Sequence, residues 1–208
     1  MNVIYLHGFG SGPASKKAKF FKKQFRTKGI EMSIPQLVEG PFEAMTLTAQ
    51  LAVVERELAR LGRSTLIGSS MGGYLAALMA ARDFRVDRVV CLAPAFDFAA
   101  RWAARIGAEA MKEWQHSGWL PVHNYAEDRE ARVGWQLYQD SLAYQAYPAV
   151  PQPALVIHGR KDDVVPLEVS EEFARRNASA KLVAVDSGHE LTDVLDLLWE
   201  RTWRFLSR

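Results

Sequence analysis

Short apolar runs alternate with longer helix-forming segments along most of the chain. Strands are predicted at residues 3–6, 32–35, 64–67, 85–93, 154–159 and 181–185. Helices are predicted between them at residues 13–28, 42–61, 73–81 and 191–206. This alternation is typical of an α/β fold with a doubly wound, mostly parallel sheet and helices on both faces. We expect six strands in the order 2-1-3-4-5-6, with the switch point between strands 1 and 3.

One interval, residues 97–152, breaks the alternation and is too long for a simple connection between strands. We interpret it as a cap insertion within a single domain that spans residues 1–208. Its pattern predicts a helix at 98–116, hairpin strands at 120–125 and 132–137 around a turn at 127–130, and a second helix at 138–146.

The segment Gly68–Gly72 has the G-x-S-x-G spacing of a nucleophile elbow. A predicted strand precedes it and a strong helix-forming segment follows it, which is the context that the motif requires. There the Ser70 hydroxyl would stand at the end of a strand, beside the unpaired N–H groups and positive dipole end of the next helix. The alternative is a Gly-rich turn without chemistry, because the bare spacing is common.

A serine nucleophile needs a base, and the chain has five histidines. His189 is the last of them and follows the last predicted strand, as the chain order Ser…Asp…His demands. The acid is expected between Ser70 and His189, again at a strand end. Asp162 is the preferred candidate and Asp163 the second, and the sequence leaves this choice open. The alternative for His189 is a solvated loop histidine.

Two backbone N–H groups are needed to bind the oxyanion that forms when a serine attacks a carbonyl. Met71, directly after the nucleophile, is expected to supply one. The Gly-rich loop after the first strand is expected to supply the other, through the amide of Phe9. A phosphate-binding loop is disfavoured, because neither G-x-x-x-x-G-K-[ST] nor G-x-G-x-x-G is present here.

Three motifs together resemble those of small α/β-hydrolases: H-G-F-G-S-G-P, I-G-S-S-M-G-G-Y and H-G-R-K-D-D-V-V-P. The chain is similar to bacterial YqiA-type esterases and to mammalian mitochondrial acyl-protein thioesterases and acyl-glucuronide esterases. The resemblance covers residues 1–96 and 153–208. It implies an α/β-hydrolase fold, with Ser70 as nucleophile, Asp162 as acid, His189 as base, and the amides of Phe9 and Met71 as oxyanion donors.

The cap interval is rich in aromatic residues, and we expect Trp102 or Trp135 to line an apolar substrate pocket. The alternative is that these side chains only pack the cap onto the core. The expected activity is that of a serine hydrolase, a carboxylesterase or thioesterase acting on apolar acyl groups. The alternatives are a hydrolase-fold binding protein with little turnover, and an acyltransferase or C–C hydrolase with the same triad.

Composition excludes several other classes of protein and of site. A hydrophobic content of 49% excludes disorder, and the single Cys91 permits neither an internal disulfide nor a cysteine-based zinc site. The expected serine-hydrolase mechanism requires no metal or organic cofactor. Without a basic and apolar leader or an apolar run of about 20 residues, we expect a cytoplasmic protein with no membrane partner.

Charge adds one further candidate. The net charge of +2 disfavours nucleic acid as a partner. The first predicted helix nevertheless concentrates basic residues, which form either a solvated face or a surface for acyl-CoA or an acyl carrier protein. The residues of this candidate surface are Lys16, Lys17, Lys19, Lys22 and Lys23.

Overall fold

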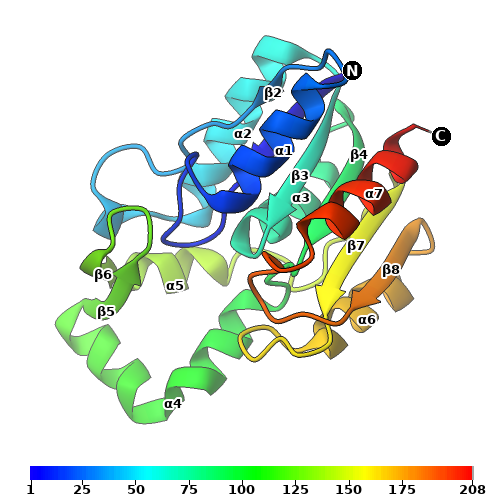
Figure 1. Ribbon diagram of the computed structural model, residues 1–208. Coiled ribbons are helices and arrows are strands. Elements are labelled where there is room, and N and C mark those ends of the chain that lie inside the picture. The colour runs from blue at the N-terminus through cyan, green and yellow to red at the C-terminus, as the bar shows by residue number, and fades with distance from the viewer. Residues whose placement is uncertain (208) are drawn as a thin grey trace.

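The central sheet of the computed structural model, which describes residues 1–207, has six strands (Figure 1). They are β1 (Asn2–Leu6), β2 (Met32–Ser33), β3 (Ser64–Ser69), β4 (Val86–Leu92), β7 (Ala154–Gly159) and β8 (Ala180–Val185). They lie in the order β2-β1-β3-β4-β7-β8, and each neighbouring pair is parallel. β5 and β6 form a separate hairpin outside this sheet, so β7 and β8 correspond to the fifth and sixth predicted strands. The predicted fold class and the strand order 2-1-3-4-5-6 are therefore confirmed.

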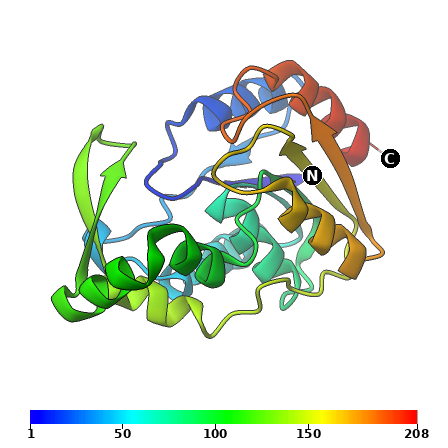
Figure 2. The same cartoon turned by 90° about the horizontal axis from the view of Figure 1, so that it is seen from below.

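Helices cover both faces of the sheet (Figure 2). One face carries α1 (Lys16–Arg26) and α7 (Leu195–Leu206), and the other carries α2 (Leu47–Leu61), α3 (Met71–Ala80) and α6 (Leu167–Arg176). Successive side chains of β1 point to opposite faces, so Val3 and Tyr5 join one core and Ile4 and Leu6 join the other. The parallel sheet is therefore buried on both sides.

Three helices begin later than the sequence pattern predicts, and capping explains two of the differences. α1 begins at Lys16 because the Ser15 side chain accepts a hydrogen bond from the Ala18 amide. α2 begins at Leu47 because the Thr46 hydroxyl accepts one from the Ala49 amide, and residues 42–44 form a separate 3₁₀ turn. α7 begins at Leu195, after a loop that continues from β8.

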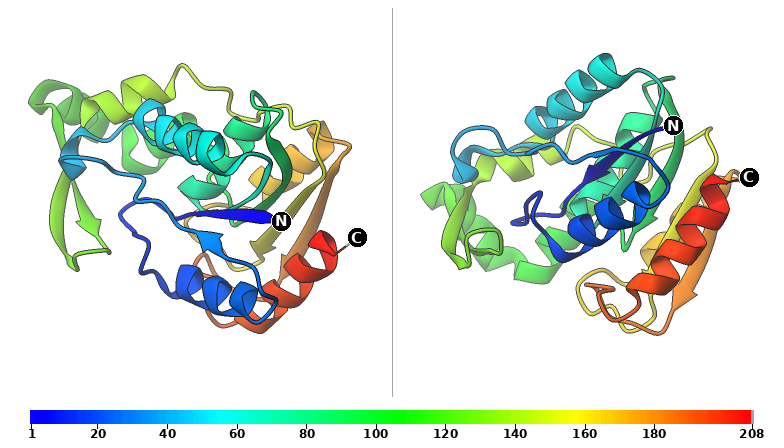
Figure 3. Two further views of the ribbon diagram at one scale, coloured as in Figure 1. Left: turned by 90° about the horizontal axis from the view of Figure 1, so that it is seen from above. Right: turned by 45° about the horizontal axis from the view of Figure 1, so that its top comes forward.

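The interval between β4 and β7 contains α4 (Phe98–Ser117), β5 (Trp119–Asn124), β6 (Arg129–Gly134) and α5 (Trp135–Ser141). In Figures 1 and 3 this group lies at the end of the molecule away from both termini. The predicted β-hairpin is present, but its second strand lies earlier in the sequence than predicted. β6 begins at Arg129, and α5 follows it directly. The turn is shorter than predicted because Asn124 Oδ1 accepts the amides of Ala126 and Glu127.

The tip of the β5–β6 hairpin touches the loop that follows β1. The Ala126 amide donates a hydrogen bond of 2.8 Å to the Gly10 carbonyl. Gly10 has a φ of +63°, and a Cβ there would lie 2.9 Å from the carbonyl oxygen of His123. Only glycine lets the loop and the hairpin approach so closely.

We predict that Gly10→Ala lowers the free energy of unfolding more than Gly29→Ala does. Both glycines have a similar φ, +63° and +68°, so both variants carry left-handed strain of about 1–2 kcal/mol. A Cβ at Gly29 meets open space, whereas at Gly10 it displaces the hairpin, which costs on the order of 1–3 kcal/mol more. Urea unfolding measures both values, and equal losses would contradict the hairpin contact.

Candidate active site

Ser70 occupies a strained turn between β3 and α3. Its φ of 53° and ψ of −118° are unusual for a residue with a side chain. The turn is possible because two neighbours are glycines: a Cβ on Gly68 would collide with the Gly72 carbonyl, and one on Gly72 with the Leu6 carbonyl. The Ser70 amide donates to the Leu92 carbonyl at 2.9 Å, which ties the turn to β4. The hydroxyl is thereby carried beyond the edge of the sheet.

Ser70, His189 and Asp162 form a hydrogen-bonded chain. His189 Nδ1 lies 2.8 Å from Asp162 Oδ2, and His189 Nε2 lies 3.0 Å from Ser70 Oγ. Because an ionised carboxylate only accepts, Nδ1 carries the proton and Nε2 is left to accept the serine hydroxyl. The three side chains follow β3, β7 and β8, whose carboxyl ends meet at one edge of the parallel sheet.

The Asp162 carboxylate has no exposed surface and is held by several donors. Its Oδ1 accepts the amides of Val164 and Val165 at 2.9 and 2.8 Å. Burial alone would raise the pKa of Asp162, but the hydrogen bonds from His158, His189 and the Val165 amide outweigh it and hold the pKa below its usual range. The carboxylate is therefore ionised at neutral pH.

The structure brings Asp162, and not Asp163, to His189. The Asp163 side chain belongs to an exposed residue on the same loop. The sequence offered both because they are adjacent and follow the same strand. It gave no weight to His158, whose buried ring contacts Asp162 and which precedes it by four residues.

The two proposed amide donors border Ser70. A Cβ on Gly8 would lie 3.4 Å from the Ser70 Cβ, so the loop that carries Phe9 runs directly beside the serine. Met71 is the first residue of α3, and its amide has no acceptor within the helix. Both N–H groups therefore belong to backbone that lies next to the hydroxyl.

Of the two tryptophans expected at a pocket, Trp102 is the one that reaches this loop. Its ring packs edge-on against Phe9, with ring centroids 5.4 Å apart. Trp135 instead packs on Trp114 and Tyr138, with centroids 5.3 and 4.8 Å away, within the inserted segment. Phe9 thus contacts Trp102, and Trp102 in turn contacts Trp114, so a chain of aromatic contacts runs from the loop after β1 into the inserted segment.

The match to a family model decides the family of this chain. The model of an uncharacterised protein family, UPF0227, matches residues 2–205. The chain belongs to the UPF0227 family. The mitochondrial palmitoyl-protein thioesterase ABHD10 of Bos taurus is 29% identical to this UPF0227 chain over 145 residues, which are 65% of the chain and 47% of the relative. The chain therefore spans about half the length of that curated relative.

Solved structures show what fold the UPF0227 chain shares. Mouse alpha/beta hydrolase domain-containing protein 10 superposes with a TM-score of 0.85 at 20% identity, covering 99% of this chain and 89% of that one. Est1E from Butyrivibrio proteoclasticus, solved with ferulic acid bound, gives a TM-score of 0.80 at 19% identity, covering 100% and 90%. The fold is that of the α/β-hydrolases, as the motifs predict.

Two other kinds of feature are absent from residues 1–207. No group of three or more His, Cys, Asp or Glu side chains within these residues is placed to hold a metal ion. Over the same part of the chain, none of the helices combines the length and apolar character needed to span a bilayer.

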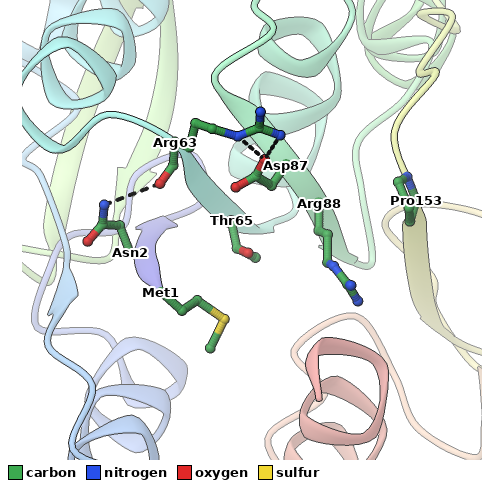
Figure 4. Close-up of a pocket in the computed structure, with 7 residues that line it drawn as sticks. All are labelled: Met1, Asn2, Arg63, Thr65, Asp87, Arg88 and Pro153. Carbon is green, nitrogen blue, oxygen red and sulfur yellow. Dashed lines mark hydrogen bonds and ion pairs between the residues drawn. The ribbon is translucent and has the colours of Figure 1, made fainter. Parts of the chain in front are cut away.

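A separate pocket lies at the opposite edge of the sheet, where the strands begin (Figure 4). Arg63 and Asp87 line it and pair with each other, with Nε 2.7 Å from Oδ1. Arg88 also lines it and donates to the Phe205 carbonyl at 2.8 Å. Its charged groups are thus already engaged, at the far ends of the strands from Ser70.

Lys17 differs from the other lysines of the candidate anion-binding surface. Its side chain is only 9% exposed, and its Nζ donates a 2.5 Å hydrogen bond to the Glu190 carbonyl, next to His189. Burial lowers the pKa of Lys17, while Glu190 acts in the opposite direction. The prediction that Lys17 forms part of an accessible basic surface is therefore wrong. Lys16, Lys19, Lys22 and Lys23 are exposed, and their affinity for an anionic acyl carrier stays a prediction.

We predict that Lys17→Met destabilises the UPF0227 chain by about 1–3 kcal/mol, because the Glu190 carbonyl loses a charged donor in a buried setting. Lys19→Met is the matched control, since Lys19 lies on the same helix and is exposed. The free energy of unfolding in urea measures both. Equal values for the two variants would mean that Lys17 does not anchor this loop.

Proposed function

We propose that this UPF0227 protein is a serine hydrolase that cleaves carboxylic esters or thioesters with an apolar acyl group. The observation that carries the proposal is the hydrogen-bonded chain from Ser70 through His189 to Asp162. The thioesterase named among its relatives and the Pyrococcus furiosus esterase named among its structural neighbours support the same reaction class. The proposed catalytic triad is Ser70, His189 and Asp162.

In the proposed reaction Ser70 Oγ attacks the acyl carbonyl while His189 Nε2 takes the hydroxyl proton. The imidazolium then gives this proton to the leaving alcohol or thiol, and an acyl-enzyme remains on Ser70. Water, deprotonated by His189, attacks this ester and releases the acid. Asp162 stays ionised throughout, because its pKa is held low, and it stabilises the imidazolium.

Charge on the carbonyl oxygen would be stabilised by the amides of Phe9 and Met71. Such a donor is typically worth about 10²–10³ in rate when it is aimed at the oxyanion. The helix dipole of α3 adds to the field at the same place, because Ser70 immediately precedes its first turn.

The aromatic rings near the serine support an apolar acyl group. Phe9 packs against Trp102 and also against Phe42, with ring centroids 5.4 and 5.8 Å apart. All three rings are partly buried and belong to the apolar core that extends into the cap. Such surfaces favour acyl chains or aromatic acids over sugars and charged peptides.

We predict that the protein hydrolyses p-nitrophenyl esters and that Ser70→Ala abolishes the turnover. A series from acetyl to palmitoyl will report which acyl length is preferred, and matched thioesters will report the leaving group. A fluorophosphonate should label Ser70 in the wild type and leave the variant unlabelled. If wild type neither turns over nor is labelled, the protein is a binding protein with a hydrolase fold.

We predict that Asp162→Asn lowers kcat by about 10⁴-fold, because the asparagine side chain favours the wrong tautomer of His189. Asp163→Asn is the matched control, since Asp163 is exposed and is adjacent in sequence. It should keep nearly full activity. Steady-state kinetics of both variants decides the acid, and a large loss in the control alone would reverse the assignment.

A further inference from the structure

A second histidine lies behind the proposed acid. His158 belongs to β7 and its side chain has no exposed surface. Its Nε2 lies 2.8 Å from the Val165 carbonyl oxygen and 3.1 Å from Asp162 Oδ2. Its Nδ1 lies 2.6 Å from Ser170 Oγ, on α6. Asp162 Oδ2 is therefore close to two imidazole rings, those of His158 and His189.

The hydrogen bonds fix the tautomer of His158. A carbonyl oxygen only accepts, so Nε2 must carry a proton and donate it to Val165. The buried Ser170 hydroxyl has Nδ1 as its only hydrogen-bond partner within residues 1–207, so the hydroxyl donates and Nδ1 accepts. His158 therefore carries its ring proton on Nε2, where the hydrogen bond goes to the Val165 carbonyl and Asp162 Oδ2 lies 3.1 Å away as a second close contact.

This arrangement secures the acid in two ways. The Nε2–H group faces Asp162 Oδ2, the same oxygen that accepts from His189, while Oδ1 takes the amides of Val164 and Val165. The bond from Nε2 to the Val165 carbonyl also holds the turn that presents those amides. Oδ1 thus has two amide donors and Oδ2 has His189, with His158 Nε2 3.1 Å away, so rotation of the carboxylate would leave buried donors unpaired.

We propose that His158 is a positioning residue, which fixes the orientation of the Asp162 carboxylate toward His189. The proposal rests on the proposed function, since it assigns Asp162 as the acid of the triad. A misplaced carboxylate would let the His189 ring turn away from Ser70, and a displacement of about 1 Å at a reacting group can cost on the order of 10²-fold in rate. Substrate binding does not involve His158, so KM should be unaffected.

Two amide substitutions separate the contacts of His158. The amide nitrogen of glutamine can take the place of Nε2, so His158→Gln can still donate toward Val165 and Asp162. The amide of asparagine reaches only the place of Nδ1, so His158→Asn can keep the Ser170 contact and loses the others. We expect His158→Asn to lower kcat by about 10- to 100-fold with KM within about twofold of wild type. His158→Gln should stay within about threefold of wild type.

A spectroscopic readout accompanies the kinetics. The low-field ¹H resonance of the His189 Nδ1 proton, assigned with ¹⁵N-labelled histidine, should persist in His158→Gln and weaken or move upfield in His158→Asn. Circular dichroism and thermal unfolding will show whether both variants fold. If His158→Asn does not fold, Ser170→Ala replaces it, because it removes the hydroxyl that holds Nδ1 and lets the ring shift, which should lower kcat severalfold with KM unchanged.

The outcomes are distinguishable. Wild-type turnover that survives in Ser70→Ala overturns the proposed function, whatever His158 does. Wild-type turnover that depends on Ser70, together with equal kcat values and an unchanged His189 resonance in the two His158 variants, overturns only the positioning role. A fall in kcat confined to His158→Asn, with the resonance altered there alone, supports it.

Discussion

The positive φ of Ser70 is possible only because Gly68 and Gly72 have no side chains. A Cβ on either residue would collide with backbone atoms. The strained backbone of Ser70 is therefore maintained by the close packing around it and not by the conformational preference of serine. The rest of the site follows from this turn. It carries the hydroxyl beyond the sheet, within 3.0 Å of His189 Nε2, and it places the serine at the start of α3, where amides lack helical acceptors.

The parallel sheet brings the other groups to the same edge, and each of the three loops there makes a contact that holds it. The loop after β1 is met by the hairpin tip at Gly10, and the loop after β8 is anchored by Lys17. The loop after β7 is held from behind by His158. The first two contacts join segments that are distant in sequence, whereas His158 and Val165 are only seven residues apart. The β5–β6 hairpin and α1 therefore help to shape the edge that carries Ser70.

The difference between the sheet, which follows from local patterns, and the contacts that hold the loops explains what could be predicted from the sequence. Strand order and the residues that meet at Ser70 follow from alternation and from short motifs, which are local patterns. The start of β6 at Arg129 could not be inferred, because the side chain of Asn124 shortens the turn. Lys17 was misjudged because its burial depends on a loop near the opposite end of the chain. The partners of His158 lie within 12 residues of it, and it is the turn after β7 and the start of α6 that bring them to its ring.

Burying an ionised carboxylate is costly unless donors replace the lost water. At Asp162 the donors that keep the group ionised also fix its direction, so low pKa and correct geometry have one cause. The side of the site where we propose that the acyl group binds is different. Phe9 and Trp102 meet there through apolar contacts, which are not directional. Under the proposed function, substitutions in residues 97–152 should therefore change which acyl groups fit, while the hydrogen-bonded chain from Ser70 to Asp162 keeps its geometry.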